Sequence, residues 1–398
     1  MYDVSGNYNN AINSNLRTVK IDIHITLSDE TILYFGDKDI LQGSLYINSR
    51  CVSGNDFDLG TVYASELGVS IRYSGDISKL QNASVSAKFG LYTSTNLEVL
   101  PLGIFEVTEI SRNGNYVKLV CMDAVIEFDK KIDTSDLIAY DNREEYKFAK
   151  KLCNIPEWCC SKCGLSSAYV SAAKFSDYPN SQTIVNFMRC RSELPTYRDL
   201  LSAALELMGC YGFINRLGYF EVAKITNDVV YKTTPYNRNS LTVSDYEINE
   251  IITSWKGMTL SDNSYGKAVA LDNNIFLDEY DKASSDTYST VANFSRAINN
   301  ELKNIKYCPC TIDYMGNPAL DVGDMIEVSP IIPSLHQYTY EDLEYITYEE
   351  LEELSYGQLS DFYAKTFNAI IMQHNWVYRG KSTIYCYGQS SKLRKVYV

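Results

Sequence analysis

The chain has 398 residues, of which 45% are hydrophobic and 22% are charged, and its formal net charge is −14. This length predicts two to four domains in a soluble globular protein. The acidic balance argues against specific, tight binding to nucleic-acid phosphates, although an acidic chain can line a passage through which DNA slides. The first ten residues are polar and no run of about 18 apolar residues occurs. We therefore expect folding in the cytosol, without membrane insertion.

The first β region spans residues 19–130, after an N-terminal arm at 1–18. Apolar and polar residues alternate from Val19 to Leu27, which is typical of a half-buried strand. Further strands are expected at Thr31–Tyr34, Leu45–Asn48, Leu67–Tyr73, Val85–Tyr92, Ile104–Ile110 and Tyr116–Met122. The turn Asn113-Gly114 joins the last two strands as a hairpin. So many short strands in succession suit a small barrel or a sandwich.

The middle region, residues 131–240, is expected to be an α+β module. Glu144–Leu152 is predicted to be a short helix, and residues 153–190 are predicted to be irregular. Thr196 is a good N-cap with Asp199 as its capping-box partner, so the strongest helix of the chain begins here. The apolar stripe of this helix consists of Leu200, Leu201, Ala204, Leu205 and Met208.

Gly209 is expected to end this helix, because glycine readily adopts the left-handed backbone of a helix C-terminus. A hairpin is then predicted from Cys210–Asn215 and Tyr219–Ile225, turning around Leu217-Gly218. Residues 226–245 are polar and rich in Tyr, Thr and Asn, and we interpret them as a linker.

The 11 cysteines are odd in number and scattered, which does not indicate a disulfide scaffold. One cluster is dense, at Cys153, Cys159, Cys160 and Cys163. The spacing of Cys159 or Cys160 with Cys163 resembles that of zinc knuckles, and Cys153 or Cys190 could complete the ligand set, so the four thiols of the cluster are zinc candidates. The alternative, buried thiols that bind no metal, is the reading that we favour, and we expect no cofactor.

The second β region spans residues 241–398. Its predicted elements are strands at Ile248–Leu260, Lys267–Leu271 and Thr311–Tyr314, a helix at Ser289–Lys306, and two long closing strands at Thr366–Tyr378 and Lys381–Gly388. Gly323-Asp324 is predicted to be a tight corner before a buried strand, and Arg379-Gly380 is predicted to be the turn between the closing strands.

An acidic insertion at residues 337–364 carries a repeat with a period of eight. No Lys or Arg occurs from Ser334 to Ala364. Candidate interface residues recur near one helical face, at Tyr340, Leu343, Tyr348, Leu351, Tyr356 and Leu359. The insertion is either a docking arm for a neighbouring subunit or a solvated decoration, and both readings stay open. The 33 tyrosines of the chain likewise suit either an interface or strands.

No motif predicts catalysis. The three histidines, His24, His336 and His374, form no Cys–His or Ser–His–Asp grouping by their spacing. Phosphate-binding loops, dinucleotide turns and the His-Glu-x-x-His motif are absent from the sequence. Asp123 ends a strand at a corner, where turn and hydrogen-bond roles are the favoured interpretation. We therefore expect that the protein is not an enzyme.

Four segments, in this order, resemble the central baseplate hub proteins of contractile phage tails and phage-tail-like particles such as R-type bacteriocins. They are Leu67–Tyr73, Gly103–Val107 with Val120–Ala124, Thr196–Leu201 leading to Gly212–Gly218, and Pro318–Asp324. The Cys-rich segment 153–190 and the acidic insertion depart from the pattern of that family.

This resemblance implies a mainly β fold with two tube-like β-barrel domains and a small α+β middle module. It also implies a homotrimer whose ring adapts a sixfold tail tube to a threefold central spike. The implied partners are further copies of the chain, the tube protein, the spike protein and other baseplate proteins. Such a chain is assembled in the bacterial cytoplasm and becomes part of a virion or of a phage-tail-like particle.

Two other classes of function compete with this reading. Tail-tip proteins often carry a domain that hydrolyses the cell wall, but the predicted elements leave no additional domain for it. A receptor- or carbohydrate-binding β module would account for the excess of aromatic residues, and it predicts that the isolated chain binds to whole cells.

Overall fold

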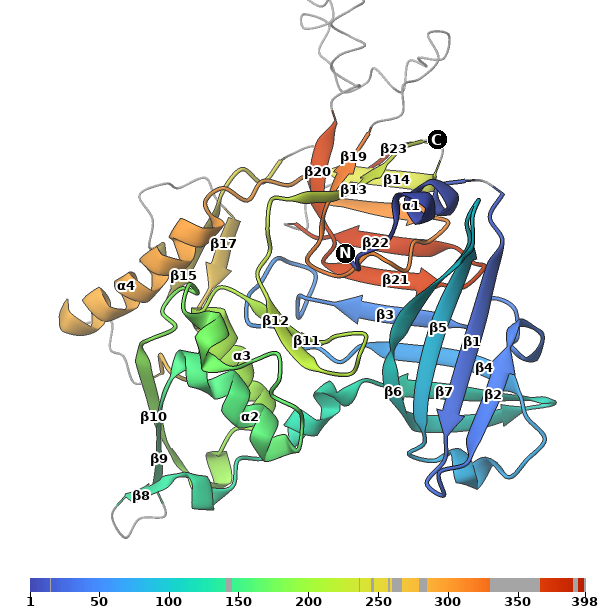
Figure 1. The fold of residues 1–398 in the computed structure, drawn as a ribbon. Coiled ribbons are helices and arrows are strands. Elements are labelled where there is room, and N and C mark those ends of the chain that lie inside the picture. The colour runs from blue at the N-terminus through green and yellow to red at the C-terminus, as the bar shows by residue number, and fades with distance from the viewer. Residues whose placement is uncertain are drawn as a thin grey trace, which may run out of the picture.

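The computed structural model describes residues 1–14, 16–140, 145–235, 237–244, 247–256, 258–259, 267–278, 285–329, 366–388 and 393–396. The prediction of a mainly β fold with a few helices is confirmed (Figure 1). The acidic insertion, with its six candidate interface residues, and His336 lie outside the described residues. Within the described ranges, no helix is both long and apolar enough to span a membrane.

All seven strands predicted in the first β region are present. They are β1 (Val19–Thr26), β2 (Ile32–Gly36), β3 (Tyr46–Arg50), β4 (Glu66–Arg72), β5 (Ser84–Tyr92), β6 (Leu97–Asn113) and β7 (Tyr116–Met122). Their order in the sheet is β2-β1-β5-β6-β7-β4-β3. Ile40 bridges to Ile71 of β4, so the first six strands in this order curl into a barrel. Its core contains every second residue of β1, because successive side chains of a strand point to opposite faces.

The middle region holds α2 (Ile155–Cys163), α3 (Tyr197–Leu207), and the strands β8 (Ile138–Tyr140), β9 (Glu145–Lys151), β10 (Ile184–Cys190), β11 (Tyr211–Ile214) and β12 (Phe220–Ala223). The predicted capping box is confirmed. The Thr196 hydroxyl accepts the Asp199 N–H at 3.1 Å, and the Asp199 carboxylate accepts the Thr196 N–H at 2.9 Å. Gly209 follows the helix with φ +66°. The predicted hairpin is present as β11 and β12.

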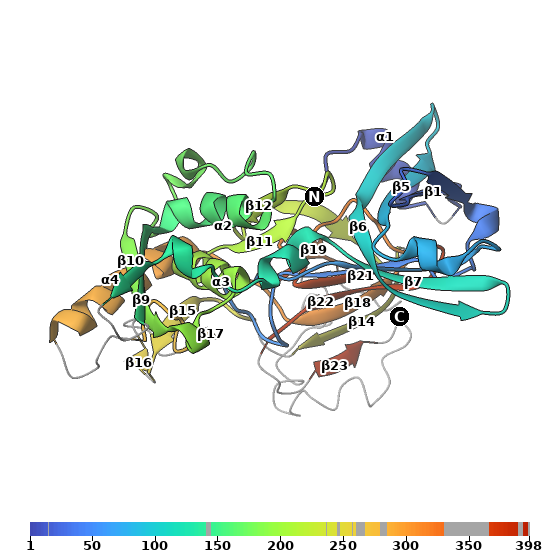
Figure 2. The same ribbon diagram turned by 90° about the horizontal axis from the view of Figure 1, so that it is seen from below.

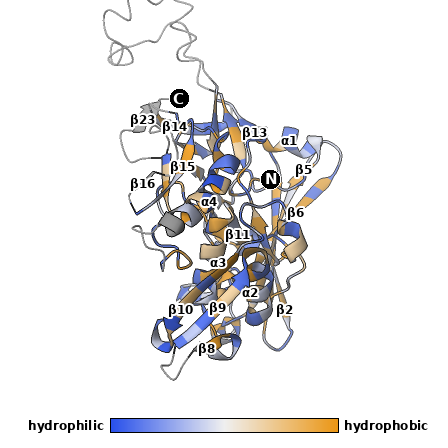
Figure 3. Cartoon of the chain, turned by 90° about the vertical axis from the view of Figure 1, so that its left-hand side faces the viewer, coloured by the Kyte–Doolittle hydropathy of each residue, from blue (hydrophilic) through white to orange (hydrophobic). Residues whose placement is uncertain are grey.

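The helix predicted at Glu144–Leu152 is wrong, because residues 145–151 form strand β9. Strand β9 pairs with β10, which lies in the segment 153–190 that was predicted to be irregular and that also contains α2. Phe148 and Phe187 stack on the buried side of this pair with ring centroids 5.2 Å apart. Burial of this aromatic pair outweighs the helix propensity of Ala149 and the neighbouring lysines. Strands β8, β9 and β10 lie together at the lower end of the molecule in Figure 3.

The second β region supplies the remaining elements. They are β13 (Val229–Thr233), β14 (Arg238–Ser244), β15 (Ile251–Trp255), β16 (Met258–Thr259), β17 (Lys267–Ala270), α4 (Ser285–Leu302), β18 (Cys310–Tyr314), β19 (Met325–Val328), β20 (Phe367–Ile370), β21 (Gln373–Val377), β22 (Ser382–Cys386) and β23 (Leu393–Val396). The linker predicted at residues 226–245 is wrong, since β13 and β14 lie there. Strand β13 pairs with β19, which is distant in sequence, so local polarity did not reveal it.

The long strand predicted at Thr366–Tyr378 is interrupted after Ile370. The N–H of Ile371 donates to the carbonyl of Asp324, and the N–H of Met372 donates to that of Tyr385. The chain therefore leaves the small sheet of β19 and β20 and enters the large sheet as β21. There β21 pairs antiparallel with β3, from Arg50↔Gln373 to Tyr46↔Val377. The two β regions consequently share one sheet of 12 strands, part of which forms a single layer in Figure 2.

A short helix in the N-terminal arm, α1 (Gly6–Ile12), contacts both β regions. Tyr8 is fully buried in the core of the first region, and its hydroxyl lies 3.3 Å from the Asn317 side-chain oxygen of the second. The arm thus connects the two β regions at a second place.

Candidate functional site

Strands β3 and β21 join the two β regions, and we call this pair the seam. One side of the surrounding sheet, the polar face, carries mostly half-buried polar side chains. They include Thr242 of β14, Thr311 and Asp313 of β18, Thr383 and Tyr385 of β22, Gln373 and Asn375 of β21, Asn48 and Arg50 of β3, Glu66 and Ser70 of β4, and Lys118 of β7. The polar face therefore runs across both β regions without a break at the seam.

Hydrogen bonds link neighbouring strands on the polar face. The amide of Gln373 donates to Asn48 at 2.9 Å across the seam. Asp313 accepts from Ser240, Thr383 and Lys381 at 2.8, 2.8 and 3.0 Å. Burial opposes ionisation of Asp313, but these three donors outweigh it and lower the pKa of the carboxyl. The charge of Asp313 is thus neutralised locally by Lys381.

The opposite side of the seam, the buried face, is tied into both β regions. Trp376 of β21 packs edge-on against Phe89 of the first barrel, with ring centroids 5.8 Å apart. Nε2 of His374 lies 2.7 Å from the Tyr314 hydroxyl. Burial lowers the pKa of His374 to about 4, so the ring is neutral at pH 7. His374 is therefore a core hydrogen-bond partner, as expected of an ordinary histidine.

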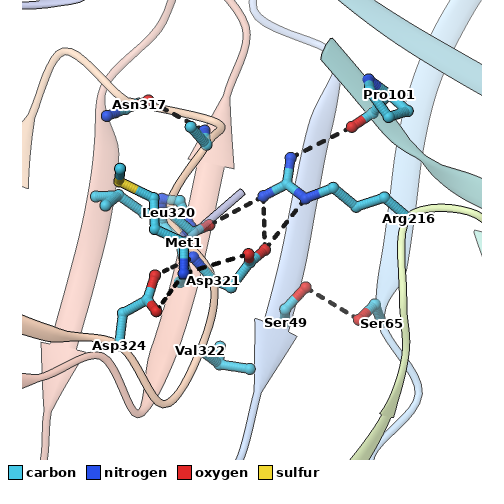
Figure 4. Close-up of polar contacts among 12 residues, drawn as sticks. Met1, Ser49, Ser65, Pro101, Arg216, Asn317, Leu320, Asp321, Val322 and Asp324 are labelled. Atoms are coloured by element: carbon cyan, nitrogen blue, oxygen red, sulfur yellow. Dashed lines mark hydrogen bonds and ion pairs between the residues drawn. The ribbon is translucent and has the colours of Figure 1, made fainter. Parts of the chain in front are cut away.

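A cavity of about 400 Å³ lies between the buried face, β6 and the β11–β12 hairpin. Its polar lining centres on Arg216, which pairs with Asp321 at 2.6 Å and donates to the carbonyl groups of Pro101 and Leu320 (Figure 4). Arg216 thereby links the hairpin of the middle region to both β regions. The sequence contains Arg216 and Asp321 in two separate matched motifs, but no sequence signal indicates that they pair.

The corner predicted at Gly323-Asp324 is confirmed, and it directly follows Asp321 and Val322, which line this cavity. Gly323 has φ +83°, and its N–H donates to the carbonyl of Ile371 at 2.7 Å. The hydroxyl of Tyr211 donates to the carbonyl of Val322 at 2.8 Å. Asp324 accepts the amino group of Met1, and burial raises the pKa of this carboxyl.

Asp123 also lines the cavity and has the turn role that the sequence predicted. Its carboxyl accepts the N–H groups of Val125 at 3.0 Å and Ser65 at 2.9 Å, and it begins a short 3-10 helix. Burial raises the pKa of Asp123 to about 7, although both hydrogen bonds oppose this shift. Asp123 thus fixes the corner after β7 and orients the chain toward the middle region.

The four zinc candidates lie at or near α2 and are buried as free thiols. Cys159 faces the carbonyl of Tyr197, whereas Cys153 faces the side chain of Asn154. Burial raises the pKa of Cys160 to about 12 and that of Cys163 to about 11, which opposes the thiolate form that zinc requires. In the part of the chain that the structure describes, no three His, Cys, Asp or Glu side chains are grouped to hold a metal.

No protein-family model matches the chain, and no curated protein matches its sequence. Among solved structures, it is similar to the 43 kDa tail protein of prophage MuSo2 from Shewanella oneidensis, with 10% identity, a TM-score of 0.45, and coverage of 96% of this chain and 100% of that one. It is also similar to a chain of the P2 virion baseplate in its activated conformation, with 8% identity, a TM-score of 0.30, and coverage of 94% and 100%.

A third similarity is to a chain of the native gene transfer agent virion, with 12% identity, a TM-score of 0.24, and coverage of 36% of this chain and 58% of that one. The structures to which the chain is similar are thus components of tails, baseplates and virions. At these identities and TM-scores, the similarity assigns neither a family nor a function to the chain.

Proposed function

We propose that this protein is a structural adaptor without catalytic activity, the central hub of the baseplate of a phage tail or phage-tail-like particle. The observation that carries the proposal is the seam, since β3 and β21 fuse two β regions into one sheet. A rigid unit with two β regions is what a ring adaptor needs, because each chain then offers two similar positions to a neighbour. The motif order that resembles hub proteins supports the same assignment.

In this proposal, three copies form a closed homotrimer, since rings of identical subunits use closed point-group symmetry. Two β regions in each of three chains present six positions to the sixfold tail tube. The three chains together present threefold symmetry to the central spike. Tube, spike and other baseplate proteins are the partners, and assembly takes place in the bacterial cytoplasm before the chain becomes part of the particle.

The polar face suits the inner wall of such a ring. Among the residues named for this face, Arg50 of β3 and Lys118 of β7 are the two basic side chains and they come from different strands, so they form no cluster of Lys and Arg on which phosphates could bind tightly. A passing DNA molecule would therefore slide along the wall. The proposal thus places the polar face toward the channel and the cavity, with its Arg216–Asp321 pair, inside the wall.

The native mass of the purified chain tests this function. A trimer of the 45.1 kDa chain has a mass of about 135 kDa, and electron microscopy should then show threefold rings. A chain that stays monomeric even when mixed with spike and tube proteins contradicts the hub assignment. Clearing of cell-wall material in a zymogram would contradict the absence of catalysis.

A further inference from the structure

The sheet of β8, β9 and β10 has an outer face that the proposed function has not used. In an antiparallel sheet, residues directly opposite one another point to the same side. Ile138, Lys147 and Met188 lie opposite one another across the three strands, and Lys151 lies opposite Ile184. The other side of the sheet contains the stacked pair Phe148 and Phe187, which is buried. These five residues therefore point away from the core, and we call them the lysine-flanked strip. The same face also carries Ala149, Asn186 and Cys190, and one acidic residue, Glu145, at its end.

The lysine-flanked strip combines exposed apolar surface with positive charge. Ile138 and Ile184 are 61% and 63% exposed, and Met188 is 37% exposed. Lys147 and Lys151 are exposed between them, and neither forms an ion pair with a carboxylate of the described residues. The Lys151 amino group donates one hydrogen bond, to the Gln182 side-chain oxygen at 3.4 Å, and this neutral partner leaves its charge uncompensated. Such a surface fits a partner that is both acidic and apolar.

The acidic insertion has this chemistry in its sequence. Residues 339–362 contain eight Asp and Glu side chains and no Lys or Arg. Along the sequence, Tyr and Leu recur in each repeat unit between these acids. A segment of this composition complements an apolar strip that is flanked by lysines, because hydrophobic burial supplies affinity and opposite charges set the register.

We propose that the lysine-flanked strip of one copy binds residues 339–362 of a neighbouring copy. The insertion joins β19 to β20, and these strands lie at the opposite end of the molecule from β8, β9 and β10 (Figure 1). This placement favours a neighbouring chain over the same chain as the source of the segment. A contact between two different surfaces is heterologous, and it closes into a ring of three when successive copies are related by a threefold rotation. This inference therefore rests on the proposed homotrimer and names one of its contacts.

The chain offers a native reporter for this contact. Of the 11 cysteines, only Cys190 is exposed, and it lies on the outer face at the end of β10, opposite Glu145. We place a cysteine at the start of each repeat unit, in the full-length variants Thr339→Cys, Thr347→Cys and Ser355→Cys. Under mild oxidation, the new cysteine should form a disulfide with Cys190. We expect at least one variant to form a disulfide between two chains, seen as a band at about twice 45.1 kDa. Adding Cys190→Ser should abolish this band.

Charge reversal tests the role of the lysines. The pair Lys147→Glu and Lys151→Glu should reduce the yield of the disulfide about tenfold at low salt. The matched control is Lys79→Glu with Lys88→Glu, two exposed lysines of the first barrel, and it should leave the yield unchanged. Replacing Glu349, Glu350, Glu352 and Glu353 by Lys should restore the yield in the reversed variant.

The outcomes separate this inference from the proposed function. The docking contact is overturned, and the hub assignment is left intact, if the chain is a trimer but no cysteine variant cross-links to Cys190. The same holds if the yield of the disulfide is unchanged by charge reversal at Lys147 and Lys151. A disulfide within one chain overturns the choice of a neighbouring copy. A chain that is monomeric with all partners present counts against the hub instead.

Discussion

At the scale of single residues, Gly323 is a position where the backbone conformation and the packing both require glycine. Its φ of +83° disfavours any residue with a Cβ, and a Cβ there would overlap the hydroxyl of Tyr211. Gly323→Ala should therefore lower the free energy of unfolding by roughly 3 kcal/mol, measured by urea denaturation. Gly114→Ala is the matched control, because Gly114 has φ +59° but open space around it, and it should cost about 1 kcal/mol. Equal losses would show that the Tyr211 contact is unimportant.

Glu206 predicts a dependence of stability on pH. Burial raises the pKa of this α3 carboxyl from 4.5 to about 7, although Asn274 donates a hydrogen bond to it at 2.6 Å. The folded chain then holds the proton more tightly than the unfolded chain does, so stability falls as the pH rises from about 4.5 to about 7. The slope from this group is at most about 1.4 kcal/mol per pH unit.

The variant Glu206→Gln keeps an acceptor for Asn274 and removes the titration. Its stability relative to the natural chain should rise between pH 5 and pH 7 and then level off, as measured by urea denaturation at each pH. Glu106→Gln, at an exposed position on β6, serves as the control. A difference between Glu206→Gln and the natural chain that does not change with pH would contradict the raised pKa.

At the scale of elements, α3 forms where the sequence predicts a helix, because its capping residues and its apolar periodicity are local features of the sequence. Capping by Thr196 and Asp199 satisfies N–H groups that would otherwise lack partners at the helix start. Thr196→Ala should cost about 1 kcal/mol in the free energy of unfolding. Ser192→Ala, at an exposed position just before the helix, should change it by less than about 0.5 kcal/mol. A neutral Thr196→Ala would mean that packing alone holds α3.

At the scale of the whole molecule, Trp376 couples the two β regions. It comes from β21 of the second region but packs in the core of the first barrel, where it is only 4% exposed. Trp376→Ala should cost about 3–5 kcal/mol and split thermal unfolding into two transitions by calorimetry. Val377→Ala, on the polar face of the same strand, should keep a single transition. A single transition in both variants would argue against coupling through Trp376.

The extent to which the sequence predicts this fold follows the range of the interactions. The alternation of strand residues from Val19 to Met122 and the caps of α3 are local patterns, and the strands and the helix that they predict are confirmed. Strand β9 was misread because its lysines and Ala149 favour a helix locally, while its pairing with β10 crosses more than 30 residues. For the candidate site, the Gly323-Asp324 corner and the turn role of Asp123 were predictable from local turn chemistry.

By itself, the sequence determined the mainly β class, the positions of most strands, the main helix, and the acidic character of residues 337–364. It could do so because periodicity, capping and charge depend on residues that are neighbours along the chain. Only the tertiary structure decided that β3 pairs with β21, that Arg216 reaches Asp321, and that Lys147 and Lys151 flank an exposed apolar strip. Each of these joins residues that are distant in sequence or depends on which side of a sheet is buried. Such contacts depend on how the folded chain minimises exposed apolar surface as a whole.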